Sequence, residues 1–193
     1  MKEKSNVFNI ELTYIQNKRL KESAIILLNL LPDYFYKVPA SSSGKFHPLY
    51  ASGNGGLIRH IKASVRIAIE ILTLECIKDE FTNDEIDLII ISLLLHDGLK
   101  HGKNYNIYTL FEHPLIIGEF IKENKDKTSF SLSEIEFLID GVTAHMGEWN
   151  KNSYNNIILP KPKTKYQKFI HICDFLSSRK FLDITFDKNN NIV

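Results

Sequence analysis

The sequence predicts an all-α protein, a bundle of helices, and three observations lead to that prediction. Apolar residues recur at helical spacing through most of the chain. Several of these segments begin with residues that favour helix starts, and prolines and glycines interrupt the pattern between them. No alternation of polar and apolar residues persists long enough to indicate a strand.

The first half of the chain contains two predicted helices with a long loop between them. The first runs from about Phe8 to Leu31 and stops at Pro32. The loop over 38–56 is rich in proline, serine and glycine, and its length favours a functional role. The second helix is predicted over Leu57–Ile77, and His60 lies on its inward face. Its exposed face is predicted to carry Lys62, Arg66 and Glu70.

The second half contains four predicted helices. A third helix should begin at Asn83 and run to His96-Asp97, and it is apolar nearly all round, which predicts a central, buried position. His113-Pro114 reads as a helix start. Capping boxes predict one helix from Ser131 toward His145 and another from Thr164 through Lys180. The polar residues that follow, 187–191, are expected to fray.

Composition limits the possible partners and the compartment. The 193 residues fit one domain, and 24 Lys+Arg against 23 Asp+Glu give a charge of +1, which argues against a strongly basic nucleic-acid surface. Cys76 and Cys173 lie in apolar helical patterns and are expected to be buried free thiols, as in a reducing compartment. The polar N-terminus and the lack of a membrane-length apolar stretch predict a cytoplasmic protein without a membrane partner.

The most informative feature is His96-Asp97 at the end of the apolar run 89–95. Burying such a pair is costly unless something neutralises it, and a metal ion would do so. Further candidate ligands lie on inward faces or at helix ends: His60, His113, His145 and Asp174. Four imidazoles and two carboxylates suit two divalent transition-metal ions, of Mn, Fe, Zn, Co or Ni. Asp97 could bridge them, with His60, His96 and Asp174 on one ion and His113 and His145 on the other. His101 and His171 are expected to be solvated.

This order of histidines and aspartates on a helical chain resembles the HD superfamily of metal-dependent phosphohydrolases. The resemblance covers 38 to about 183, so 1–193 is expected to form a single HD domain with the helix over 8–31 packed on its core. The segments Val38–Ser41, His47 and Gly55–His60 are similar to a motif of YhaM-type 3′–5′ exoribonucleases and HD relaxases. Three later stretches resemble motifs that carry the remaining ligands: His96–Lys100, Ala144–Glu148, and Pro160–Thr164 with His171–Asp174.

Several features depart from the family pattern. Gly98 and Leu99 are swapped relative to the usual order, although Lys100 keeps its spacing from Asp97. Met146 replaces the second histidine of a His-His pair, which argues against a cyclic-dinucleotide phosphodiesterase. The absence of an OB-type β domain before the core argues against a processive exonuclease.

The resemblance implies hydrolysis of phosphoester bonds in a nucleotide or a short single-stranded nucleic acid. Asp97 and Lys100 are the expected catalytic residues, Asp97 as the shared metal ligand and Lys100 as a cation that stabilises charge on the phosphoryl oxygens. The expected substrate contacts are Ser42, Ser43, Lys45, His47, Arg59 and Arg179. Two other functions stay open: an HD-fold di-iron oxygenase, and a nucleic-acid-binding HD module without hydrolysis.

Overall fold

The computed structural model describes residues 3–42, 44, 47–77, 79–182 and 184–193. These residues form α-helices and short 3-10 turns, and their only β pairing is an isolated bridge between Phe186 and Ile192. The predicted all-α fold is therefore confirmed. Within the described ranges, no helix combines the length and the apolar character needed to cross a membrane.

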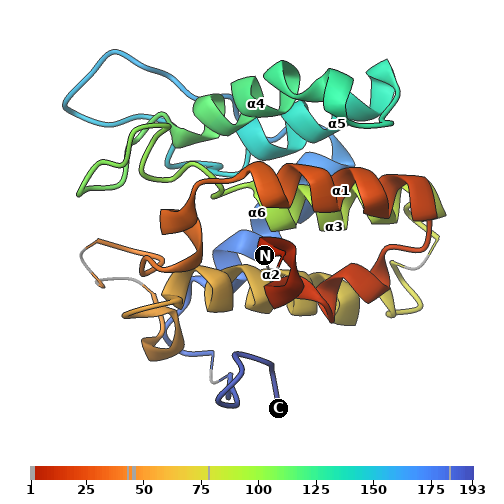
Figure 1. The fold of residues 1–193 in the computed structure, drawn as a ribbon, viewed down its shortest axis with the longest axis horizontal. Coiled ribbons are helices and arrows are strands. Elements are labelled where there is room, and N and C mark those ends of the chain that lie inside the picture. The colour runs from red at the N-terminus through yellow and green to blue at the C-terminus, as the bar shows by residue number, and fades with distance from the viewer. Residues whose placement is uncertain (1–2, 43, 45–46, 78, 183) are drawn as a thin grey trace.

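A central helix organises the bundle. The helices are α1 (Lys18–Leu30), α2 (Gly56–Leu72), α3 (Asn83–Leu95), α4 (His113–Glu123), α5 (Leu132–Thr143) and α6 (Lys165–Ser177). Helix α3 contacts α1, α2, α5 and α6, and every residue over 87–95 is buried, as the all-round apolar pattern predicted. Figure 1 shows α4 and α5 on one side of α3 and α2 on the other.

The helix starts follow the capping residues. Ser131 and Thr164 each form the predicted capping box, and α4 begins at His113 with Pro114 in its first turn. Helix α3 is capped one residue earlier than predicted, because Thr82 accepts a hydrogen bond from the Glu85 N–H and completes a box. The last helix ends at Ser177, before the predicted Lys180.

The predicted helix over Phe8–Leu31 is wrong in its first half. The chain instead forms two 3-10 turns, η1 (Lys4–Phe8) and η2 (Glu11–Tyr14), before α1. The carboxylate of Asp87 on α3 accepts hydrogen bonds from the backbone N–H groups of Gln16 and Asn17, at 2.9 and 2.7 Å. These bonds hold the chain out of helical conformation, and Asn17 then caps α1.

The N-terminal turns also overturn the prediction for Lys62. Its side chain is buried, with Nζ 3.5 Å from Oε2 of Glu11 in η2 and 3.3 Å from Oδ1 of Asn191. Residues 187–191, expected to fray, form a turn in which the Asp187 carboxylate accepts two backbone N–H bonds. Both terminal segments therefore cover Lys62, whereas Arg66 and Glu70 are exposed as predicted.

Helix α2 ends at Leu72, five residues before the predicted end at Ile77. Cys76 consequently lies beyond the helix and is exposed, which contradicts its predicted burial, whereas Cys173 on α6 is buried as predicted. Figure 1 shows the first turn of α2 at the same end of the bundle as the end of α3, the start of α4 and the end of α5. This end of the bundle carries most of the predicted metal ligands.

Candidate metal centre and pocket

His60 owes its position to the close approach between α2 and the preceding loop. A Cβ at Gly56 would lie 2.2 Å from the carbonyl oxygen of Ala51, so only glycine fits this contact. Gly55 before it has a φ of +72°, which also favours glycine. The start of α2 is thus seated on the loop, and His60, one turn on, is buried and directed inward.

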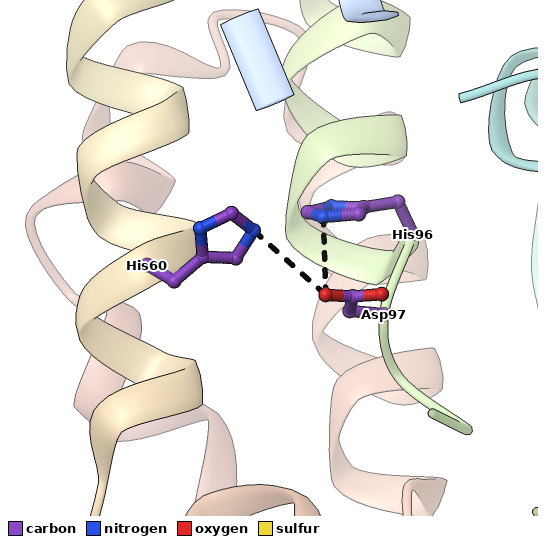
Figure 2. Close-up of side chains that lie close together, drawn as sticks. All are labelled: His60, His96 and Asp97. Carbon is purple, nitrogen blue, oxygen red and sulfur yellow. Dashed lines mark ion pairs between the residues drawn. The ribbon is translucent and has the colours of Figure 1, made fainter. Parts of the chain in front are cut away.

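One half of the cluster joins His60 and His96 to two carboxylates. Nε2 of His60 lies 3.0 Å from Oδ1 of Asp174 and 3.8 Å from Oδ2 of Asp97. Nε2 of His96 lies 3.4 and 3.6 Å from the same two oxygens. Figure 2 shows both rings directed at the Asp97 carboxylate, one from α2 and one from just beyond α3. Residues far apart in sequence therefore meet around two oxygen atoms.

The other half uses the second oxygen of Asp97. Nε2 of His113 lies 3.0 Å and Nε2 of His145 lies 3.8 Å from Oδ1 of Asp97. The two Nε2 atoms lie 3.2 Å apart. The structure thus brings together all six residues that the sequence singled out as ligands, and Asp97 stands between the two halves. Two subsets have donor atoms close enough to share an ion: His60 with His96 and Asp97, and Asp97 with His113 and His145.

Backbone carbonyls fix the tautomers of three histidines. Nδ1 of each of these rings lies 2.6–2.7 Å from a carbonyl oxygen three residues earlier, in the pairs His96–Leu93, His113–Leu110 and His145–Val142. A carbonyl oxygen only accepts, so Nδ1 carries the proton and donates it. In the neutral ring, Nε2 then presents its lone pair to the cluster. This is the arrangement that metal-binding histidines use.

Ser177 does the same for His60 through its hydroxyl. The Ser177 hydroxyl donates to the carbonyl oxygen of Asp174 at 2.8 Å, and its oxygen lies 3.1 Å from Nδ1 of His60. Since the single hydroxyl proton is already used, the oxygen accepts from Nδ1–H. Nε2 of His60 is therefore also free to bind a cation.

With these tautomers, the lone pairs of the imidazole Nε2 atoms face the lone pairs of the carboxylate oxygens. Nε2 of His60, Nε2 of His96 and Oδ1 of Asp97 are buried and have no hydrogen-bond partner among the described residues. Such groups are costly to bury unless a cation lies among them. Imidazole nitrogens and carboxylate oxygens are ligands for divalent transition metals. The donor set therefore fits a metal centre.

The charge states of most of these residues suit metal binding. His96 is the exception, because burial works to lower its pKa but Asp97 and Asp174 outweigh burial and raise it, so a metal ion would have to displace its proton. Burial, reinforced by the charge of His96, lowers the pKa of His145 to about 3, so its ring is neutral at neutral pH. Burial works to raise the pKa of Asp97, but Lys100 and His96 hold it well below its usual range. Asp174 is also held ionised, because His96 and His60 outweigh the burial that would raise its pKa. Neutral imidazole and ionised carboxylate are the forms that bind metals.

Lys100 stands beside the cluster, as its spacing from Asp97 predicted. Its side chain is nearly buried, and Nζ lies 2.5 Å from Oδ2 of Asp97. It also lines a pocket of about 490 Å³ that opens onto Asp97, His113, His145 and Asp174. A cation and the candidate metal centre therefore share one pocket.

The predicted substrate contacts divide into three groups. Ser42, His47 and Arg179 line the pocket, while Ser43 and Lys45 lie outside the described residues. Arg59 is not brought to the pocket, and its guanidinium donates to backbone carbonyls of Tyr50, Ser52 and Asn54 and to the side chain of Asn190. As the neighbour of His60 in a helix, Arg59 projects about 100° around the axis of α2 from it, and there it holds the loop.

His171 is a pocket residue that the sequence analysis assigned to solvent. Its Nδ1 lies 2.7 Å from the carbonyl oxygen of His145, and its Nε2 lies 3.1 Å from Oε2 of Glu148. Gly147, with a φ of +59°, packs against the ring so closely that a Cβ would lie 2.2 Å from it. The motif Ala144–Glu148 is the one sequence feature that could have indicated this position of His171, because Gly147 within it leaves room for a large side chain.

Other differences concern aromatic residues and His101. His101 is buried rather than solvated, with Nδ1 2.6 Å from the Asn106 carbonyl oxygen and its ring stacked on Tyr105. Trp149 and Phe175 line the pocket. No spacing in the sequence marked them, because they reach it from a loop and from a partly buried helix face.

Comparison of the chain with protein-family models, with curated proteins and with solved structures finds no match. The described residues provide two groups that share Asp97 and could each hold a metal ion, a neighbouring lysine and a pocket large enough for a small ligand.

Proposed function

We propose that this protein is a metal-dependent phosphohydrolase that cleaves a phosphoester bond of a nucleotide or of a short single-stranded nucleic acid. The observation that carries the proposal is the convergence of four imidazole Nε2 atoms on Asp97 and Asp174, with Lys100 beside them at the edge of a pocket. The order of these residues along the chain, which resembles the HD superfamily, supports the same conclusion.

The proposed centre holds two divalent transition-metal ions. His60, His96, Asp97 and Asp174 would hold one ion, and Asp97, His113 and His145 would hold the other. Ions in such sites supply an activated water and neutralise charge on phosphoryl oxygens. The near-neutral net charge of +1 favours a small or short substrate over a long duplex.

The protein's own residues position and stabilise the phosphate group. Lys100 is fixed by Asp97 at the pocket wall, where its remaining N–H bonds can be donated to a phosphoryl oxygen as negative charge develops. Burial lowers the pKa of His47 to about 3, so its ring is neutral at neutral pH. Its place in the pocket suits a hydrogen bond to the substrate.

The test is metal content, measured by mass spectrometry on protein purified without chelator. We expect about two ions per chain in the wild type and loss of both the metal and Mn²⁺-dependent hydrolysis of bis(p-nitrophenyl) phosphate in Asp97→Ala. Asp126→Ala is the matched control, because this exposed aspartate lies in the turn after α4, at the other end of that helix from His113. Full metal occupancy in folded Asp97→Ala would disprove the site. Bound iron without phosphoester hydrolysis would replace the proposal by the oxygenase alternative.

A further inference from the structure

One wall of the pocket is a stack of flat side chains. Trp149, from the loop after α5, and Phe175, from α6, lie nearly parallel, with ring centroids 5.5 Å apart and an interplanar angle of 13°. The guanidinium carbon of Arg179 lies 4.2 Å from the Phe175 centroid and 5.7 Å from the Trp149 centroid. All three residues line the same pocket as the metal cluster.

Arg179 has no acidic partner within the described part of the chain. Its Nε and Nη2 donate to the hydroxyl of its neighbour Ser178, at 3.2 and 2.7 Å, and no carboxylate of a described residue forms an ion pair with it. A guanidinium beside aromatic rings can keep its remaining N–H groups available for an acceptor. The stack therefore offers both a planar surface and a positive charge that no carboxylate of the described residues pairs with.

Trp149 is half-exposed, yet its backbone is well fixed. The backbone N–H of Trp149 donates to the carbonyl oxygen of Met146 at 3.1 Å. The next residue, Asn150, is buried and closes the loop through two bonds to Leu159, each 3.0 Å long. The residue as a whole keeps 45 % of its surface exposed. A rigid, accessible indole is suited to stacking on a ligand without first being ordered.

The stack and the metal cluster are joined by consecutive residues of α6. Asp174 faces His60 and His96, and Phe175 belongs to the stack. Hydroxyls complete the pocket, where Ser42 and Thr109 lie with their oxygens 3.2 Å apart. A volume of about 490 Å³ lies in the range of pockets that enclose one small ligand. A single nucleotide unit matches these features, with an anionic group, a hydroxylated sugar and a planar base.

We propose that Trp149, Phe175 and Arg179 form a base-binding subsite that takes the nucleobase of one nucleotide unit. Bases stack on aromatic rings and on arginine guanidinium planes, and this stacking contributes substantially to binding. The placement of the phosphate at the metal cluster rests on the proposed function. The stacking of the base does not, because it needs no metal.

Intrinsic fluorescence gives a direct test, because Trp149 is the only tryptophan in the chain. The full chain is titrated with adenosine, adenosine monophosphate and ribose 5-phosphate. We expect the two ligands that carry a base to quench Trp149 with saturation, and ribose 5-phosphate to leave its emission unchanged. Absence of saturable quenching by either base-containing ligand would overturn the subsite.

Variants test the same subsite by equilibrium dialysis. Trp149→Ala and Arg179→Ala should each weaken binding of adenosine monophosphate about tenfold or more, with binding of ribose 5-phosphate unchanged. Trp149→Phe should retain most of the affinity, because it keeps an aromatic face. Tyr154→Ala is the control, since this aromatic side chain is 94 % exposed and does not line the pocket. Unaltered affinity in both folded alanine variants would contradict the proposal.

The outcomes separate this inference from the proposed function. Adenosine that quenches Trp149 in a chain that binds no metal would leave the subsite standing and overturn the phosphohydrolase. A chain that binds metal and hydrolyses phosphoesters with no effect of Trp149→Ala or Arg179→Ala would support the phosphohydrolase and overturn the subsite.

Discussion

Ser177 determines which nitrogen of His60 faces the cluster. Its hydroxyl donates to Asp174 and accepts from Nδ1 of His60, so the ring presents Nε2 to the carboxylates. Hydrogen-bond partners of metal-binding histidines typically contribute a factor of about 10–100 in metal affinity. We therefore expect Ser177→Ala to weaken metal binding by about this factor without unfolding the protein. Competition with a chromophoric chelator measures the change.

The control for this variant is Ser64→Ala. Ser64 is also buried on a helix and donates to a backbone carbonyl, that of Ile61, but it does not touch the cluster. Its loss should leave the metal affinity unchanged. Equal weakening in both variants would mean that Ser177 acts through general packing rather than through the His60 tautomer.

At the scale of the element, the start of α2 depends on Gly56. A Cβ there would lie 2.2 Å from the carbonyl oxygen and 2.6 Å from the carbonyl carbon of Ala51, and backbone cannot move aside as a flexible side chain can. We expect Gly56→Ala to lower the free energy of unfolding by about 2 kcal/mol or more, in the range of overpacked sites or above it. Denaturant unfolding followed by circular dichroism measures this.

Gly53→Ala is the matched control in the same loop. Gly53 has a φ of +65°, and nothing lies within 4 Å of its Cβ position, so the substitution costs only backbone strain of about 1–2 kcal/mol. If Gly56→Ala costs no more than Gly53→Ala, the contact between α2 and the loop does not constrain the helix start.

Local signals predicted the elements that local chemistry controls. Pro114, Ser131 and Thr164 mark the starts of α4, α5 and α6. The burial of α3 follows from its all-round apolar sequence. The meeting of the predicted ligands followed from the same placement of helix ends. Where tertiary contacts decide, the predictions failed, as in the segment before α1, which Asp87 holds in a non-helical conformation.

The same distinction applies to the pocket. The residue types that bind metals are few, so a sequence reveals candidate ligands, and all six candidates converge. Pocket walls use side chains that occur anywhere in a protein. The role of Trp149 and Phe175 could not be predicted, because it depends on how a loop packs against a helix. Arg59 shows the converse, because a residue next to a ligand in sequence faces away from the site.

At the scale of the whole molecule, both terminal segments converge on one buried cation. Lys62 on α2 contacts Glu11 from the N-terminal turns and Asn191 from the C-terminal turn. Burial raises the pKa of Glu11, and the charge of Lys62 lowers it in part. This interaction therefore links the two ends of the chain to the helix that carries His60.

Removing Lys62 should leave Glu11 buried without a countercharge, so we expect Lys62→Met to lower the free energy of unfolding by about 3–5 kcal/mol at pH 7.5. Without Lys62, the pKa of Glu11 in the folded protein would rise further. A carboxyl whose pKa is raised by folding stabilises the folded state when it is protonated. This stabilisation is lost as pH rises through the raised pKa. The loss should consequently be smaller at pH 5 than at pH 7.5. The double variant Lys62→Met with Glu11→Leu should recover most of the stability at both values, because no buried charge remains. Denaturant unfolding at the two pH values measures the stability of the wild type, Lys62→Met and the double variant. If Lys62→Met loses the same stability at both pH values, Glu11 is not the group left without a partner.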